Sequence, residues 1–193
     1  MAIADELAKL RGDIDLKFVS YGTGAMTFTG HRKPVIDLEM PDTNPLWTTV
    51  VRAGQVIGQM QPDLIISHEE FAVLPVAKIF NLPAVFITEW FANPEDLRMQ
   101  TLSYADEVIF IGDPGTSEEP PCVEGKVHYT GPVLRSFAYG RSDRDRARRE
   151  LALPQDATLI LVVPGSWTEE KAPICDILMP VFNDLKAPQK LLV

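Results

Sequence analysis

The stretch PDLIISHEEFAVLPVAKIFNLPAVFITEWF, residues 62–91, decides the fold of this chain. It opens with the short apolar run DLIIS (63–67), continues through a helical pattern over 71–80, and returns to a second apolar run, AVFI (84–87). Short continuous apolar runs are typical of strands that are buried on both faces. Two such strands joined through a helix form a βαβ unit, which requires a parallel sheet.

The alternation of helices and strands continues on both sides of this unit. We therefore predict an α/β protein whose first part is a Rossmann-like parallel sheet with flanking helices. The segment YGTGA, residues 21–25, interrupts the pattern and is predicted to be a turn. The other elements expected in this part are helices over 3–10, 46–60 and 95–104 and strands over 16–20, 34–38, 107–112 and 126–131, the last at a sheet edge.

A change of pattern near Gly140 indicates a domain boundary. We predict that residues 1–140 form the first domain and that residues 141–193 form a linker helix and the start of a second Rossmann-like domain. A segment of about fifty residues is too short to bury a full core of its own. In this part we expect Ser142 to cap the linker helix, a buried strand over 157–166, a helix over 174–185 kinked at Pro180, and a strand beginning near residue 189.

Composition excludes several classes of protein. The chain has 193 residues, of which 46% are hydrophobic, and a net charge of -9. No apolar run approaches the ~18 residues that span a membrane, and the negative charge argues against binding to nucleic acid phosphates. Cys122 and Cys175 are too few for a disulfide framework or a zinc site. We therefore expect a protein of the reducing cytoplasm.

Ligands bind at the carboxyl ends of the strands in open parallel sheets, so the residues that follow each strand are the candidate site. The densest polar group there is Ser67, His68, Glu69 and Glu70, just before the next predicted helix. Such side chains can hydrogen-bond substrate hydroxyls, and one of them can serve as a base. The alternative is that Ser67 or His68 caps the helix while the two acids stabilise its positive end.

A second polar and aromatic group follows the next strand. Thr88, Glu89, Trp90 and Phe91 come directly after the apolar run AVFI. Two large aromatic rings at a strand end can form a wall for a sugar or a lipid. They can equally pack as a small cluster beneath a loop, and the sequence leaves both interpretations open.

Two segments of the second part suggest anionic ligands. Gly165 and Ser166 lie between a predicted strand and a predicted helix, where backbone N–H groups and the helix dipole suit a diphosphate. The arginine-rich stretch at 141–150 is interpreted as a solvated helix with i,i+4 ion pairs. Contact with anionic lipid head groups, and so a peripheral position at the inner face of the membrane, is the alternative.

Four segments together resemble a known family. Residues 62–91, ADEVIFIG (105–112), VHYTGPVLR (127–135) and LALPQDATLILVVPGS (151–166) occur in the order found in nucleotide-sugar glycosyltransferases of the GT-B fold. The chain is most similar to the family 28 group, which includes the peptidoglycan N-acetylglucosaminyltransferase and diacylglycerol glucosyltransferases. The pattern V-x-Y-T-G-P-V-x-R is the most specific part of this resemblance.

The resemblance implies a sugar transfer with inversion and without a metal, another cofactor or a covalent intermediate. The donor would be a nucleotide-diphosphate sugar carrying a hexose or an N-acetylhexosamine, and the acceptor a lipid-linked or small-molecule hydroxyl. The first domain would bind the acceptor and the second the donor. Carried over by position, the acceptor side would comprise His68, Glu69, Glu70, Thr88, Glu89 and Trp90, and the donor diphosphate would face Gly165 and Ser166.

This sequence departs from the family pattern at both ends. The family begins with a strand and a glycine-rich loop ending in Gly-His, which supplies the usual base, and here Met1 falls in the following helix. The family's donor motif would lie beyond Val193. The catalytic residues are therefore left unassigned, and we expect this chain alone to be an inactive fragment of a transferase. The alternatives are an acceptor-binding subunit of a split transferase and a nucleotide-sugar epimerase of the GT-B fold.

The missing first strand also has a structural consequence. In the family this strand lies centrally in the sheet, so its absence would leave the strands at 16–20 and 63–67 with unpaired edges. Unpaired edges invite pairing with another chain. We therefore expect either a strand-swapped oligomer or a marginally stable chain.

Overall fold

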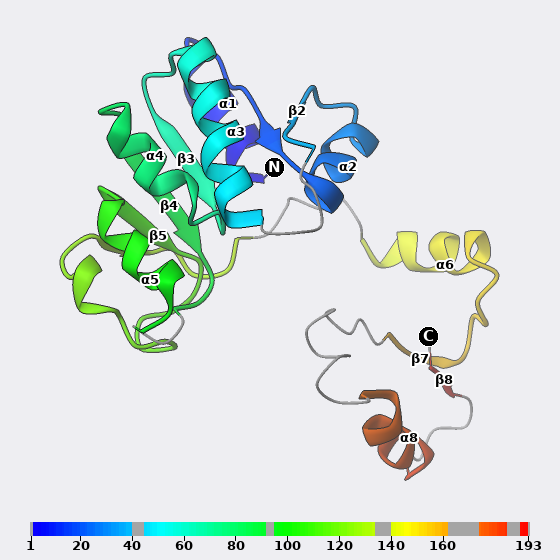
Figure 1. Cartoon of the computed structure of the whole chain (residues 1–193). Coiled ribbons are helices and arrows are strands. Elements are labelled where there is room, and N and C mark those ends of the chain that lie inside the picture. Colours follow the sequence, from blue (N-terminus) through cyan, green and yellow to red (C-terminus); the bar gives the residue numbers. More distant parts are fainter. Residues whose placement is uncertain are drawn as a thin grey trace. The chain divides into compact units, whose positions relative to one another are not determined.

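The computed structural model describes residues 2–39, 45–91, 95–133, 140–161, 174–184 and 190–192. The chain divides into two compact units, Met1–Arg135 and Ser136–Val193, each of which is described by itself (Figure 1).

A four-stranded parallel sheet forms the centre of the first unit. Its strands are β3 (Ile65–His68), β4 (Ala84–Thr88), β5 (Glu107–Phe110) and β6 (Val127–Tyr129), in the order β3-β4-β5-β6. Every neighbouring pair is parallel, and one row across the sheet runs Ser67, Phe86, Val108 and Val127. The strands predicted from the apolar runs are confirmed, and so are the parallel pairing and the edge position of the last strand.

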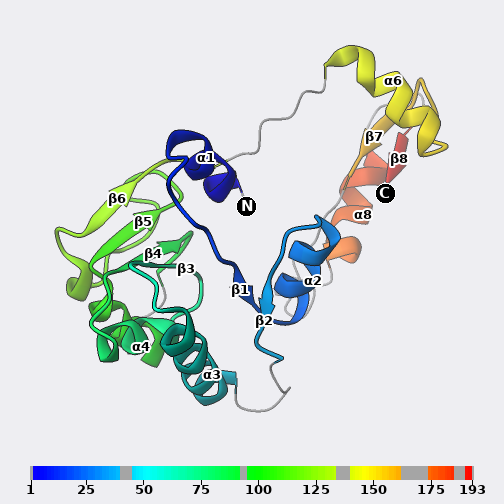
Figure 2. The ribbon, with the colours of Figure 1, turned by 90° about the horizontal axis from the view of Figure 1, so that it is seen from above.

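Helices bury one face of this sheet. They are α4 (Val73–Ile79), α5 (Leu97–Thr101) and the short 3-10 helices η1 (Leu102–Tyr104) and η2 (Pro121–Val123), and α3 (Pro45–Met60) packs on α4. Seen from above, α3 and α4 lie on one side of the sheet, and α1 (Ala2–Leu10) lies on the other (Figure 2). The core cluster comprises Phe71, Leu74, Ala77, Ala84, Phe86, Met99, Leu102, Ala105, Val108 and Val123.

The amino-terminal part of this unit differs from prediction. The strands expected over 16–20 and 34–38 shrink to β1 (Val19–Ser20) and β2 (Ile36–Asp37), which pair in parallel. The turn predicted at 21–25 is wrong, because α2 (Gly22–Gly30) begins there. The sequence of this helix has little apolar periodicity, so periodicity did not predict it. It is held instead by tertiary contacts, since the ring of Phe28 packs on that of Phe18 with centroids 4.8 Å apart.

The outer edges of β1 and β3, which the sequence predicted to be unpaired, have no partner in the part of the chain that the structure describes. β1 pairs only with β2, and β3 pairs only with β4. Leu64 and Ile66, at β3, are 45% and 43% exposed. An additional strand supplied by a second chain stays a prediction.

The second unit contains a helix followed by two paired strands with a helix between them. Its elements are α6 (Arg141–Glu150), β7 (Thr158–Ile160), α8 (Ile174–Asp184) and β8 (Lys190–Leu192), and β7 is parallel to β8. Pro180 lies inside α8, and the kink expected there stays a prediction. The cap predicted at Ser142 is wrong, because the helix begins at Arg141 and its N-cap is Gly140, two residues earlier. The backbone N–H of Gly140 donates to Oδ2 of Asp143 at 2.8 Å, so a carboxylate in the first turn of the helix stabilises its amino-terminal end.

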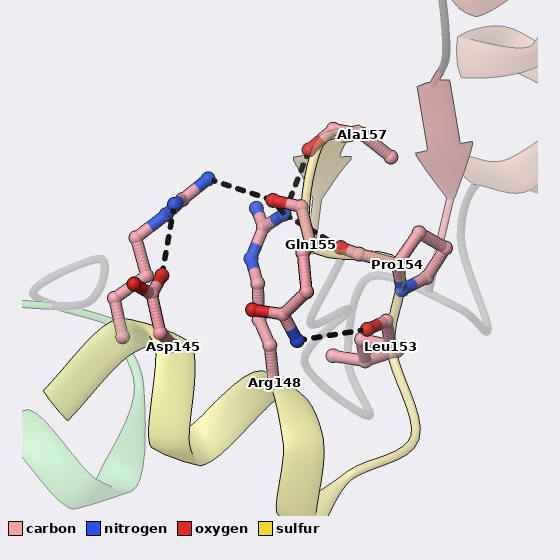
Figure 3. Close-up of polar contacts among 7 residues, drawn as sticks. Asp145, Arg148, Leu153, Pro154, Gln155 and Ala157 are labelled. Atoms are coloured by element: carbon pink, nitrogen blue, oxygen red, sulfur yellow. Dashed lines mark hydrogen bonds and ion pairs between the residues drawn. The ribbon is translucent and has the colours of Figure 1, made fainter.

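One arginine of α6 is buried rather than solvated. Arg148 is 8% exposed, and its Nη1 lies 2.8, 2.8 and 2.9 Å from the carbonyl oxygens of Pro154, Gln155 and Ala157 (Figure 3). It thereby ties α6 to the segment that enters β7. Elsewhere on the helix, Arg146 pairs with Asp143 at 2.8 Å, as expected for a solvated face. Contact of this helix with lipid head groups stays a prediction.

Candidate functional site

The polar residues that follow β3 and β4 meet at one edge of the sheet. The register pairs His68 with Ile87, so the two carboxyl ends lie side by side. A side chain from one strand end reaches the other, because Oε1 of Glu69 accepts a hydrogen bond from the backbone N–H of Glu89 at 3.1 Å. The structure therefore brings together the residues that the sequence nominated on the two strands.

Glu70 connects three elements. Its Oε1 accepts from the N–H of Ala72, just before α4, at 3.0 Å. Its Oε2 accepts from the hydroxyl of Tyr21, which follows β1, at 2.6 Å. The hydroxyl of Ser67 donates to the Glu70 carbonyl at 2.7 Å, which closes the turn. The N-cap residue of α4 is Ala72, and no side chain caps this helix, so neither Ser67 nor His68 acts as the cap. The Glu70 carboxylate instead holds the ends of β1 and β3 together.

Tyr21 is a member of this group that sequence reasoning missed. Burial raises the pKa of its hydroxyl above the ordinary value, and the hydrogen bond to Glu70 raises this pKa further. The phenol accordingly stays protonated and remains a donor across the neutral range. The signal that was available is its position directly after a predicted strand, which is the same argument that selected His68.

His68 and Glu69 are the two residues of this group whose features point to a functional role. The imidazole of His68 is exposed and has no hydrogen-bond partner among the residues that the structure describes. Glu69 has a φ of 59°, in the left-handed region that non-glycine residues rarely adopt. A strained backbone of this kind persists only where its surroundings enforce it, and such residues cluster at functional sites.

Packing surrounds the aromatic residue after β4. The Trp90 ring lies 6.0 Å from that of Phe71, and the guanidinium of Arg98 lies 5.3 Å from the Trp90 ring centroid. The buried hydroxyl of Thr88 donates to the carbonyl of Trp90 at 2.8 Å and fixes the turn. This geometry favours the packed-cluster interpretation for Trp90, with a cation–π contact on the ring.

Arg98 is a second residue that sequence reasoning missed. It forms a two-point ion pair with Asp96, with Nη2 2.6 Å from Oδ2 and Nε 3.0 Å from Oδ1. This pair lowers the pKa of Asp96 to about 2. The guanidinium is thereby held over Trp90, beside the end of β4.

The remaining predictions concern the donor site, metal binding and the membrane. Gly165 and Ser166 fall outside the described residues. Within the described ranges, no group of three or more His, Cys, Asp or Glu side chains is arranged to hold a metal ion. No helix in the part of the chain that the structure describes has the length and apolar content needed to cross a membrane.

Parallel sheets with flanking helices make this chain an α/β protein, and its likeness to solved structures shows the GT-B fold. Three solved structures share this fold. They are a putative UDP-N-acetylglucosamine 2-epimerase from Listeria monocytogenes (TM-score 0.64, 15% identity), MurG from Acinetobacter baumannii (0.56, 12%) and a complex of S. aureus MnaA with UDP (0.56, 16%). The comparisons cover 99%, 100% and 87% of this chain.

The amino-acid sequence is also similar to that of a known protein. An uncharacterized glycosyltransferase of Methanopyrus kandleri is 25% identical over an alignment of 120 residues, and the alignment covers 58% of this chain. No protein-family model matches the chain. The matched region is 35% of that relative, and the chain spans 56%, 60% and 50% of the three solved structures.

Proposed function

We propose that this chain carries the acceptor side, and the beginning of the donor side, of a nucleotide-sugar glycosyltransferase of the GT-B fold. The observation that carries the proposal is the meeting of the β3 and β4 ends, where Glu69 bonds the backbone of Glu89. Similarity to a glycosyltransferase sequence supports the activity, and the solved structures support the fold. The V-x-Y-T-G-P-V-x-R pattern at 127–135 supports the family 28 type.

The proposed reaction joins a sugar to an acceptor hydroxyl. The acceptor oxygen attacks the anomeric carbon, its proton passes to a base, and the nucleoside diphosphate leaves with the electron pair of the broken bond. The edge formed by His68, Glu69 and Glu89 would hold the acceptor, which is a lipid-linked or small-molecule hydroxyl. Gly165 and Ser166 would face the diphosphate of the donor. A carboxylate at hydrogen-bond distance orients a hydroxyl, and an unpartnered imidazole can take its proton.

Steady-state transfer by the whole protein tests this proposal. The assay supplies UDP-N-acetylglucosamine or UDP-glucose with a panel of hydroxyl acceptors and measures release of UDP. We expect Glu69→Gln to raise KM for the acceptor more than it lowers kcat. The matched control is Glu124→Gln, an exposed acid just before β6, at the opposite edge of the sheet. Equal KM values for the two variants would remove Glu69 from the acceptor site.

A nucleotide-sugar epimerase is the second candidate. The highest TM-score of the three solved structures, 0.64, is to a putative UDP-N-acetylglucosamine 2-epimerase. The same assay separates the candidates when the acceptor is left out. An epimerase would convert UDP-N-acetylglucosamine into its 2-epimer, whereas a transferase would leave the sugar nucleotide unchanged.

A further inference from the structure

A shallow hollow, largely open to solvent, lies outside the group just described, at the carboxyl end of β2 and against α3. Its volume is about 340 Å³, within the range of about 300–1,000 Å³ that is typical of small-molecule sites. Both strand end and helix contribute polar side chains to it. Among the described residues, its lining comprises Asp37, Leu38, Glu39, Arg52, Gln55 and Val56, and we call this hollow the β2 pocket.

The wall of the β2 pocket is fixed by side chains. Nη1 of Arg52 donates to the carbonyl oxygens of Leu38 and Glu39. Oδ1 of Asp37 accepts from the N–H of Glu39 at 2.8 Å, and Leu38 is buried against the core. These contacts hold Glu39 in the left-handed region, with a φ of 48°. The pocket is therefore shaped before any ligand arrives, which lowers the entropic cost of binding.

Several hydrogen-bond donors and acceptors of the β2 pocket have no protein partner among the described residues. Among the contacts of the described residues, the Nε and Nη2 groups of Arg52 have no protein partner, nor do the Gln55 amide and the Glu39 carboxylate. Donors and acceptors are thus both present. Two carboxylates, of Asp37 and Glu39, outweigh one guanidinium, so an anionic ligand would be repelled. A neutral ring with several hydroxyls can donate to the carboxylates and accept from the guanidinium and the amide.

The pocket lies at the same edge of the unit as the candidate site. β2 runs parallel to β1, so their carboxyl ends point the same way. Tyr21, directly after β1, donates to Glu70, which follows β3. The carboxyl ends of β2, β1 and β3 are therefore linked along one edge, where ligands of open α/β sheets bind.

We propose that the β2 pocket is a carbohydrate subsite that binds a neutral sugar ring of the acceptor. The role as an acceptor subsite rests on the transferase function proposed above, but sugar binding by the pocket does not. Gln55 and Arg52 donate to ring hydroxyls, and Asp37 and Glu39 accept from them.

Binding of methyl β-D-glucopyranoside to the ¹⁵N-labelled chain tests the proposal by NMR titration. We expect shifts of the Gln55 side-chain amide and of the backbone amides of Asp37 and Glu39. Gln55→Ala should weaken binding about three- to tenfold, the effect of one lost hydrogen bond. The matched control is Gln61→Ala, an exposed residue at the end of the same helix, which should bind as the parent chain does. Gln55 is exposed on α3, so this variant should keep the fold.

The possible results separate this inference from the proposed function. Absence of shifts at Asp37, Glu39 and Gln55 overturns the subsite, and so does equal binding by the two variants. Tighter binding of glucose 6-phosphate than of the neutral glucoside also overturns it, because the pocket would then select anions. If the glucoside binds as expected but the whole protein transfers no sugar, the subsite stands and the transferase function fails.

Discussion

Replacing Tyr21 by phenylalanine tests whether one hydrogen bond holds the ends of β1 and β3 together. The hydroxyl lies 2.6 Å from Oε2 of Glu70, and both residues are half-buried. A hydrogen bond to a charged group contributes about 1.5–3 kcal/mol. Because partial exposure weakens it, we expect the unfolding free energy to fall by about 1–2 kcal/mol. In a chain of this size the corresponding decrease in Tm is roughly 2–8 °C.

Urea unfolding at neutral pH, followed by circular dichroism, measures this loss. The matched control is Tyr129→Phe, since the Tyr129 hydroxyl also bonds a carboxylate, Glu119, at 2.5 Å. That pair is at the surface and only ten residues apart in sequence, so its removal should cost less than about 0.5 kcal/mol. Equal losses in the two variants would refute the structural role of Tyr21. So would strict additivity of Tyr21→Phe and Glu70→Gln, because a direct bond requires coupling.

The same variant changes the alkaline limit of stability. The folded state holds the Tyr21 proton more tightly than the unfolded chain does, because burial and Glu70 raise the pKa of this hydroxyl from 10.0. The resulting stability is complete below the unfolded pKa and is lost as the pH rises through the folded-state pKa. Tyr21→Phe should therefore flatten the decline in unfolding free energy above about pH 10. An unchanged decline would show that Tyr21 is not shielded in the folded state.

Four further substitutions test other parts of the fold. Gly58→Ala should raise the unfolding free energy by about 0.5–1 kcal/mol, because an added Cβ in α3 meets only ordinary contacts. Gly112→Ala should lower the unfolding free energy, because a Cβ there would lie 2.7 Å from the buried ring of Phe110. Equal unfolding free energies of the two variants in urea titrations would contradict both expectations. Asp96→Asn keeps a helix-capping side chain but loses the ion pair with Arg98 that lowers the Asp96 pKa to about 2. The parent chain should therefore lose this small contribution as the pH falls from about 4 through about 2, and the variant should not. Ile66→Lys should abolish any self-association seen by sedimentation velocity, because a lysine on an edge strand opposes pairing, and a stable monomeric parent chain would count against strand exchange.

The four-stranded sheet was predictable because the pattern that indicates each strand lies within a few consecutive residues. Its first three strands, β3, β4 and β5, are short apolar runs, and such a run is a local signal for a strand of a parallel sheet. The edge position of β6 also followed from the alternating pattern of KVHYTG. The convergence of His68, Glu69 and Glu89 then required only the rule that parallel strands end at one edge.

The parts that were missed depend on contacts between distant residues. α2 lacks an apolar period, and Tyr21 and Glu70 are 49 residues apart, so no pattern in the sequence relates them. The burial of Arg148 could not be predicted either, because it depends on carbonyl oxygens from a different segment. An arginine among four others looks solvated until the carbonyls that it binds are placed in space.

The strand order β3-β4-β5-β6 has a consequence for how the chain folds. Every strand of this sheet pairs with the next strand along the chain, so each pairing closes a short loop at a small entropic cost. We expect this sheet to form early and to grow one strand at a time as the chain leaves the ribosome. The bond from Tyr21 to Glu70 closes a longer loop, so β1 and β2 should join last. The contact of Glu69 with Glu89 would then form with the sheet, and the bond from Tyr21 to Glu70 would complete the polar edge last.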